Sequence, residues 1–202
     1  MEEKEEQLYL EASVLFKTYG IKSMTMDDIA RSLKISKKTL YKYVNDKNDL
    51  VCKSMKLDLE KSECAFTDVC DQDVDPIEEL FNIGAFAAEH LKSLHPSVMY
   101  DIQKYHPEAW RYFEEHKDTH IYKSVLDNME RGKEKGVFRK ELNSIIIAKL
   151  YVARFDVIFN PEIFSPIEYS FAKVHKEMMD YHLHGILTQK GLEILNKHQD
   201  NN

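Results

Sequence analysis

The chain has 202 residues, 43% of them apolar and 31% charged, and a formal net charge of −7, values ordinary for a globular protein with a sizeable core. Only 6 Gly and 5 Pro interrupt long stretches of helical periodicity, which excludes the many short strands of a sandwich or barrel. The sequence therefore predicts an all-α fold of about nine helices.

The first residues and the longest apolar region both argue against export and against a membrane anchor. Residues 1–6 are mostly acidic, where a signal peptide would have a basic segment followed by an apolar one. Residues 145–159 are apolar but contain Lys149, Arg154 and Asp156, too many charges for a membrane span. We therefore expect a cytoplasmic protein with no membrane partner.

Capping signals divide the first part of the chain into three helices. The first is predicted from an apolar face that ends before Gly20 and consists of Leu8, Ala12, Leu15, Phe16 and Tyr19. Thr25, followed by Asp28, is a variant of the capping box and opens a short second helix. Ser36 is a natural N-cap for a third helix that runs to about Tyr43.

The second and third predicted helices have the spacing of a helix-turn-helix. Two helices that cross after a tight turn need a small residue at the crossing and apolar anchors beyond it. Ala30, Ile35 and Leu40 meet these needs. With Leu40 turned inward, the residues that face outward, as reading DNA requires, are Lys37, Lys38, Thr39, Tyr41, Lys42 and Tyr43. Packing of both tyrosines against the next helix is the alternative interpretation.

Positive charge is concentrated around the third helix. Residues 31–56 contain eight basic and two acidic side chains, a net charge of +6, whereas the net charge of residues 57–202 is −9. A short basic block on an acidic chain indicates a local site for a polyanion, whereas a solvated helix face would not need so few opposing charges. Asp46 is a candidate cap for a fourth helix, which would place Lys47 beside backbone N–H groups that can bind a phosphate.

The segment LEASVLFKTYGIKSMTMDDIARSLKISKKTLYKYVNDKNDL resembles the DNA-binding module of the TetR/AcrR family of transcriptional regulators. The resemblance implies a repressor that binds a palindromic double-stranded DNA operator as a homodimer, through a three-helix helix-turn-helix domain at residues 1–47. The family pattern implies phosphate contacts from Thr25, Thr39, Tyr41, Tyr43 and Lys47, and contacts with bases or flanking backbone from Met26, Lys37, Lys38 and Lys42. The N-cap Ser36 completes the predicted DNA-binding set.

Two positions of the segment depart from the family pattern. Lys34 replaces the usual turn glycine, and a left-handed conformation at this position would cost ~1 kcal/mol. Val44 replaces the usual aromatic residue after the second tyrosine. Neither departure removes a predicted contact with DNA.

The remaining residues, 48–202, are predicted to form a helical domain for effector binding and dimerisation. A long fourth helix over about residues 47–70 would join the two domains. Three further helices are expected to begin at Pro76, Pro96 and Pro107. The last of these is predicted to be one long helix that closes near Gly132 or Gly136.

Aromatic residues are abundant in the middle of the chain. The resemblance implies a cavity there for a small-molecule effector of hydrophobic or aromatic character. The candidate lining residues are Phe81, Phe86, Met99, Tyr100, Trp110, Phe113 and Tyr122. A role in an ordinary apolar core is the alternative for each of them.

The last two predicted helices are expected to form a four-helix interface with a second copy of the chain. Asn143 can cap a helix that is apolar all round, and a long helix after Pro166 has apolar residues at steps of three and four. The predicted interface residues are Ile146, Leu150, Val157, Ile167, Phe171, Val174, Met178 and Tyr181. Packing within one chain is the alternative for each helix taken alone.

An enzyme and a protein-interaction module are the alternative functions from other classes. No nucleophile beside a base and no glycine-rich phosphate loop is recognisable, so we expect no catalytic residues and no cofactor. His116 and His120 lie one helical turn apart, but spacing fixes no third ligand, so no metal site is expected. A helical interaction module without a DNA role would leave the block of net charge +6 unexplained.

Overall fold

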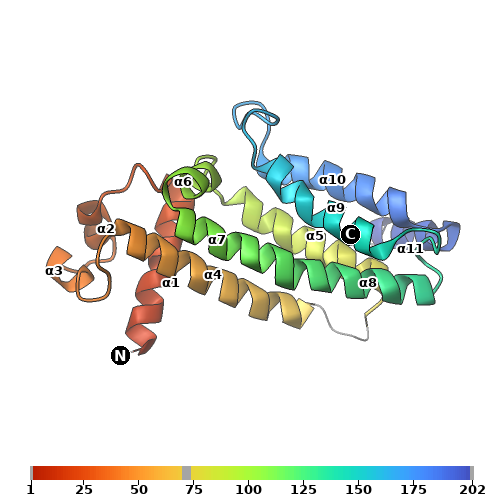
Figure 1. Cartoon of the computed structure of the whole chain (residues 1–202), viewed down its shortest axis with the longest axis horizontal. Helices are drawn as coiled ribbons and strands as arrows, with labels where there is room; N and C mark the ends of the chain where they lie inside the picture. Colours follow the sequence, from red (N-terminus) through yellow and green to blue (C-terminus); the bar gives the residue numbers. More distant parts are fainter. Residues whose placement is uncertain (1, 70–73, 201–202) are drawn as a thin grey trace. The chain divides into compact units, whose positions relative to one another are not determined.

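The computed structural model describes residues 2–69 and 74–200, and the side chains of residues 3–62 and 74–197 (Figure 1). Eleven α-helices and one π-helical turn occur in these residues, so the predicted all-α fold is confirmed. The chain divides into two compact units: unit 1 is Met1–Glu63 with Ser93–His116, and unit 2 is Cys64–Lys92 with Lys117–Asn202. The predicted DNA-binding segment 1–47 lies wholly in unit 1. No helix of the described ranges has the length and apolar character needed to cross a membrane.

Unit 1 contains the predicted helix-turn-helix and two later helices. Its helices are α1 (Glu2–Tyr19), α2 (Met26–Ser32), α3 (Lys37–Leu40), the first part of α4 (Lys47–Val69), α6 (Val98–Tyr105) and α7 (Pro107–His116). Its core includes the buried side chains of Ala12, Phe16, Ile29, Leu40 and Leu50. The first helix ends where predicted because Gly20 adopts a φ of +81°, a left-handed conformation that is without steric cost in glycine.

Two contacts join α1 to other segments of unit 1. Lys17 Nζ lies 2.6 Å from Asp58 Oδ1 on α4, and both side chains are about three-quarters buried. The backbone carbonyl of Lys17 accepts the N–H of His95 at 2.6 Å. The helix that carries the apolar face of the first fifty residues is therefore fixed against later parts of the same unit.

Unit 2 contains the remaining helices around its own apolar core. They are α5 (Pro76–Lys92), a π-helical turn (Lys117–Ile121), α8 (Tyr122–Glu134), α9 (Ser144–Ile158), α10 (Phe171–Ile186) and α11 (Gln189–Asp200). Within this unit α8 packs against α9, and α5 packs against α8 and α10. Asn143 caps α9 as predicted, since its Oδ1 accepts the N–H of Ile146 at 3.2 Å.

A backbone pairing joins the segment after α8 to the end of α10. Phe138 and Leu187 form an antiparallel bridge, the N–H of Arg139 donates to Ile186 O at 2.9 Å, and the N–H of Thr188 donates to Val137 O at 3.0 Å. The ring of Phe138 lies directly on Gly132, where any side chain would collide with it. Gly132 is therefore required by close packing, because its own backbone lies inside a regular helix.

The helices differ from the prediction at several places, and α6 begins at Val98 where a start at Pro96 was expected. The helix predicted from Pro107 onward is interrupted by the π-helical turn, whose first residue, Lys117, is buried and donates to Asp156 Oδ1 at 2.7 Å. A separate helix, α11, follows α10, and together these two changes raise the number from about nine to eleven. The third helix has four residues, and residues 41–43 continue it only as turns.

The prediction that Ile167 lies on the last long helix is wrong. That helix, α10, begins at Phe171 because Ser170 Oγ accepts the N–H of Lys173 at 3.3 Å and caps it. Ile167 lies in the preceding turn and is 96% exposed. The apolar spacing that was used for the prediction includes Ile167, which precedes the capping residue Ser170. Apolar periodicity alone does not show where such a cap begins the helix.

Candidate nucleic-acid interface

Both helix starts predicted for the helix-turn-helix carry the expected caps. Thr25 and Asp28 form a complete capping box: Asp28 N–H donates to Thr25 Oγ1 at 3.2 Å, and Thr25 N–H donates to Asp28 Oδ2 at 3.1 Å. The hydrogen bonds from Thr25 hold the pKa of the Asp28 carboxyl below its usual value. At the next helix, Thr39 N–H donates to Ser36 Oγ at 3.0 Å.

The turn between α2 and α3 is tight and contains the departure at Lys34. Lys34 adopts a φ of +54°, the left-handed conformation that the sequence analysis assigned to it. The N–H of the next residue, Ile35, donates to Ala30 O at 3.0 Å, and Ala30 is buried where the helices cross. Lys34 thus adopts the turn conformation that glycine adopts without strain, and its backbone is strained as a result.

The recognition segment, residues 36–43, presents a basic surface. Leu40 is fully buried and anchors the segment, while Lys37, Lys38, Tyr41 and Lys42 are exposed. Thr39 and Tyr43 are half-buried. The outward orientation predicted from the position of Leu40 is therefore present for the three lysines and Tyr41, and partly present for the other two.

The backbone carbonyl of Tyr43 is held by two side chains that the sequence analysis did not identify. It accepts from Lys53 Nζ at 2.8 Å and lies 3.1 Å from the hydroxyl of Tyr9 on α1. Burial and a hydrogen bond to the Glu5 carboxylate raise the pKa of Tyr9 above its usual value, so the phenol stays protonated. Its single proton is shared between the Glu5 carboxylate at 2.6 Å and the Tyr43 carbonyl at 3.1 Å. The role of Tyr9 could have been suspected from the sequence, because Tyr9 follows Leu8 and lies next to the predicted apolar face of the first helix.

Lys47 is the first residue of α4, as predicted. Asp46 caps this helix, because its Oδ1 accepts the N–H of Asp49 at 2.8 Å. The Lys47 side chain is half-buried, and this burial lowers the pKa of its ammonium group, opposed by the nearby charge of Asp101. Lys47 therefore lies beside a helix N-terminus, where an anion would also meet backbone N–H groups.

Three of the residues predicted to contact DNA already have contacts within the chain. Met26 is 9% exposed and belongs to the core of unit 1, which leaves little of it for a base edge. Thr25 Oγ1 lies 2.5 Å from Asp28 Oδ2. Lys37 forms an ion pair with Asp27 of α2, which raises the pKa of its ammonium group. Lys38, Tyr41 and Lys42 are exposed and, among the described residues, form no ion pair.

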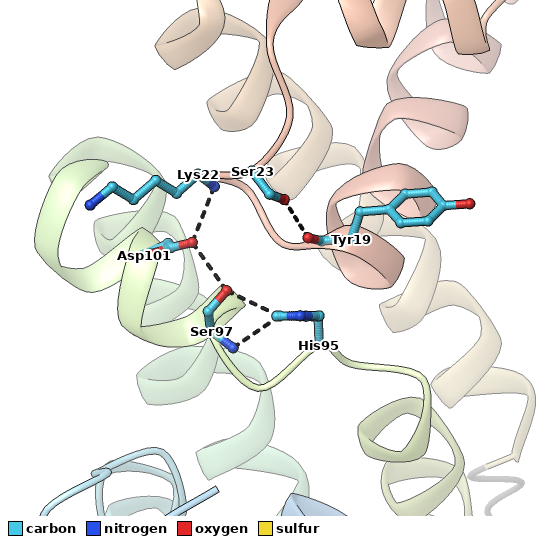
Figure 2. A pocket seen from close by; sticks show the side chains of 6 residues that line it. All are labelled: Tyr19, Lys22, Ser23, His95, Ser97 and Asp101. Atoms are coloured by element: carbon cyan, nitrogen blue, oxygen red, sulfur yellow. Dashed lines mark hydrogen bonds between the residues drawn. The ribbon is translucent and has the colours of Figure 1, made fainter. Parts of the chain in front are cut away.

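Unit 1 also contains an open pocket of about 410 Å³ that was not expected from the sequence (Figure 2). Its lining residues are Tyr19, Lys22, Ser23, His95, Ser97 and Asp101. Asp101 is buried, and its Oδ2 accepts from the Lys22 N–H and from Ser97 Oγ, each at 3.2 Å. His95 Nδ1 lies 3.1 Å from the same hydroxyl.

This pocket does not have the arrangement of a nucleophilic triad. Ser97 stands between His95 and Asp101, whereas a triad needs the histidine in the middle, hydrogen-bonded to both. The group instead fixes the turn after α1 to the start of α6, through the backbone N–H of Lys22. Among the described residues, no group of three or more His, Cys, Asp or Glu side chains could hold a metal ion.

The residues predicted to line an effector cavity are divided between the two units. Met99, Tyr100, Trp110 and Phe113 belong to unit 1, whereas Phe81, Phe86 and Tyr122 belong to unit 2. Within unit 1 the rings of Trp110 and Phe113 have centroids 5.3 Å apart. Within unit 2 Phe81 and Tyr122 pack against the apolar core. A common cavity for the whole set stays a prediction.

The side chains of the predicted dimer residues range from exposed to buried. Ile146 and Leu150 on α9 and Tyr181 on α10 are 54%, 63% and 84% exposed. Val157 and Met178 are half-buried. Phe171 and Val174 are buried within the single chain, so they contribute to the core of unit 2.

Comparisons with known proteins agree with this architecture. Residues 9–52 match the family model described as bacterial regulatory proteins, tetR family. The chain is 20% identical over 185 residues to the HTH-type transcriptional regulator YvaF of Bacillus subtilis (strain 168), covering 90% of this chain and 95% of that protein.

Solved structures of similar fold include two transcriptional regulators. One, from Saccharomonospora viridis in complex with choline, has a TM-score of 0.75 at 16% identity and covers 94% of this chain and 100% of its own. The other, a TetR-family regulator from Agrobacterium tumefaciens, has a TM-score of 0.72 at 15% identity and covers 92% of this chain and 99% of its own. At these identities the likeness shows a shared fold.

Proposed function

We propose that the protein is a transcriptional regulator of the TetR family, a cytoplasmic repressor that binds a palindromic operator as a homodimer through its helix-turn-helix domain; the match of residues 9–52 to the family model and the similarity to the regulator YvaF support this. We further propose that a small-molecule effector releases it from DNA. The main support for the proposal is the basic recognition segment. Its residues Lys38, Tyr41 and Lys42 are exposed, and both α2 and α3 begin with a capping residue.

The composition of the recognition segment suits a duplex. Exposed lysines attract the phosphates, and a tyrosine hydroxyl can donate to a phosphate oxygen while its ring lies against the backbone sugars. Lys47, at the N-terminus of α4, supports a further phosphate contact. These groups would place the four-residue α3 in the major groove, where base edges differ between sequences.

Selection from a randomised duplex library tests operator binding directly. The full-length protein should enrich a near-palindrome whose half-sites are separated by about 34–36 Å or a multiple of it, because two recognition segments must enter successive major grooves. Binding should weaken steeply with salt. A full-length dimer that enriches no sequence and binds no duplex at low salt would contradict the proposal.

Dimerisation through α9 and α10 is supported by apolar side chains that one chain leaves exposed. Ile145, Ile146 and Leu150 on α9 and Tyr181 on α10 are all more than half exposed. We call these four residues the candidate dimer face. Large apolar side chains at this density on neighbouring helices are typical of a surface that a partner covers.

Release by an effector is supported by the fold. The regulator from Saccharomonospora viridis was solved in complex with choline, so a protein of this fold can hold a small molecule. A ligand that prefers one arrangement of a dimer would change the spacing of the two recognition segments, and operator DNA must weaken its binding by the same factor. Operator affinity measured with and without a bound ligand tests this coupling.

A further inference from the structure

Arg154 on α9 is a buried cation whose hydrogen-bonding capacity is largely unused. It is 5% exposed, and its Nη1 donates to the thioether sulfur of Met179 at 2.6 Å, a weak acceptor. Its Nε and Nη2 have no hydrogen-bond partner among the described residues. Burying a charged group without satisfying its donors is costly, so these two N–H groups require an explanation.

Two other buried or partly buried cations of unit 2 are each paired with a carboxylate, which is the usual way to offset the cost of burying a charge. The buried Lys117 donates to Asp156 Oδ1 at 2.7 Å, and the partly buried Arg131 pairs with the buried Glu79 carboxylate. No carboxylate of the described residues forms an ion pair with Arg154. The acid that would balance Arg154 is therefore not supplied by the described part of its own chain.

The groups around Arg154 form a polar cluster inside an apolar environment. Its guanidinium carbon lies 3.4 Å from the ring centroid of Tyr151 and 5.3 Å from that of Phe155. His175 Nδ1 and His182 Nε2 are buried and also lack partners among the described residues, while the buried Tyr151 hydroxyl faces Arg154 and forms no hydrogen bond of normal geometry. The cluster thus combines one cation with three neutral polar groups on two adjacent helices, α9 and α10.

Both histidines of the cluster are neutral near physiological pH. Burial lowers the pKa of His175 and of His182 to about 4, and the charge of Arg154 acts in the same direction. His175 Nε2 lies 3.2 Å from the carbonyl oxygen of Gly84 on α5 and donates to it, so its Nδ1 remains an acceptor. The net charge of the cluster is therefore +1, which a monoanion balances and a phosphate dianion exceeds.

The two unpartnered nitrogens of Arg154 define the shape of the missing acceptor. Nε–H and one N–H of Nη2 point in parallel from one edge of the guanidinium plane, and this edge matches the two oxygens of a carboxylate. We propose that Arg154 binds the carboxylate of a monocarboxylic acid with an apolar body, and that the Tyr151 hydroxyl donates to the same group. The inference rests on the proposed function, because it names the chemical class of the effector.

A carboxylate from a second copy of the chain is a poorer candidate for this position. Arg154, Tyr151 and His175 are already 5%, 2% and 0% exposed in a single chain. The exposed residues of α9 that a partner could cover are mostly apolar, namely Ile145, Ile146, Leu150 and Ala153, with Lys149 and Asp156 beside them. A free acid can pass during a transient opening of unit 2, whereas a side chain fixed on a partner's surface would have to cross the wall of the unit.

Matched acids and amides test the proposal on the full-length protein. Titration calorimetry and thermal unfolding should detect binding of butyrate, octanoate, laurate or benzoate, and no binding of the corresponding amides, which have the same shape without the charge. Arg154→Met should reduce the affinity for the acid at least about 100-fold, since a bidentate charged contact is lost. The half-exposed Arg139 provides the control, and Arg139→Met should bind the acid unchanged.

Stability separates this role from a structural one. Arg154→Met should unfold at the same or a higher temperature than the unliganded native protein, because replacing an uncompensated buried charge by an apolar side chain removes a desolvation cost. Tyr151→Phe, which deletes one hydroxyl, should weaken acid binding about tenfold. A destabilised Arg154→Met, or unchanged acid binding in Tyr151→Phe, would overturn the assignment.

Two outcomes distinguish this inference from the proposed function. Equal binding of acids and amides, or of none of them at millimolar concentration, overturns the carboxylate site while leaving operator binding intact. Acid binding that depends on Arg154 but does not change operator affinity supports the site and overturns its role as the effector site.

Discussion

Lys37 Nζ lies 2.8 Å from Asp27 Oδ2, so an acid at the start of α2 neutralises the first lysine of the recognition segment. A phosphate must displace this carboxylate to bind Lys37. Exposed ion pairs of this kind contribute about 0–1 kcal/mol, so Asp27→Asn should raise duplex affinity by up to about fivefold at low salt. Fluorescence anisotropy with a labelled operator would measure the change. Asp127→Asn, an exposed acid of unit 2, is the control, and a similar gain there would indicate only a general effect of net charge.

Lys38 and Lys42 should each contribute to the salt dependence of DNA binding. Both are exposed and form no ion pair within the described ranges. Replacing either by alanine should reduce the slope of log affinity against log salt concentration by about 0.9, provided the side chain contacts a phosphate. If Lys38 reads a base, the variant should instead change the selected operator sequence. The exposed Lys123 of unit 2 should give no change when replaced by alanine.

The candidate dimer face should tolerate a charge in the monomer but not in the dimer. Leu150→Glu and Tyr181→Glu place a carboxylate on side chains that are mostly exposed in one chain, so each variant should fold and sediment as a monomer. Val14→Glu, at an apolar residue 61% exposed on α1, should remain dimeric. Analytical ultracentrifugation distinguishes the states. If both Leu150→Glu and Tyr181→Glu remain dimeric, the interface does not include the candidate dimer face.

The left-handed turn at Lys34 should be a site where glycine stabilises the protein. Lys34 adopts a φ of +54°, which costs a side-chain-bearing residue about 1–2 kcal/mol. Glycine removes this cost but gains freedom in the unfolded chain, so Lys34→Gly should raise the free energy of unfolding by about 0.5–1 kcal/mol. Lys38→Gly, inside α3, should lower it by about 1 kcal/mol. Urea denaturation measures both, and a loss of stability in Lys34→Gly would refute the strain.

Acid should destabilise unit 2 through His175. Its pKa is about 4 in the folded chain and close to 6.5 when unfolded, so the unfolded chain binds more protons between these values. The stability from a neutral His175 is present above pH 6.5 and is lost as the pH falls towards 4. The charged and titratable groups near it are Arg154 on α9 and His182 on α10, and α5 contributes the Gly84 carbonyl.

The size of this effect can be measured against a variant without the imidazole. The difference between the two pKa values corresponds to a loss on the order of 3 kcal/mol near pH 4. Urea midpoints of the native protein should fall more steeply from pH 7 to pH 4 than those of His175→Gln. Parallel curves for the two proteins would show that His175 does not titrate as its environment indicates.

Three helix starts were predictable because capping chemistry depends on residues three positions apart. Thr25, Ser36 and Asn143 all cap the helices expected from them. Burial within the last helices was not predictable in the same way. Phe171 and Val174 share the apolar spacing of Tyr181, yet they lie in the core and Tyr181 lies outside. Periodicity gives a face of a helix but does not identify what covers it.

Arg154 illustrates the same limit at a single residue. In the sequence it is one of three charges that argue against a membrane span, and nothing in its neighbours along the chain indicates burial. Its surroundings come from two helices, since Tyr151 precedes it on α9 while His175 and Met179 lie on α10. A site assembled from residues more than twenty positions apart requires the fold.

The pairing of Phe138 with Leu187 closes residues 138–187 into a ring of chain held by backbone hydrogen bonds. Both ends of the segment that contains α9 and α10 are thereby tied at one place. Leu150 of the candidate dimer face and Arg154 stand one turn apart on the same helix of this ring. A displacement of the Arg154 guanidinium by an anion would therefore be carried to Leu150 as motion of α9, and would reach the candidate dimer face without passing through a loop.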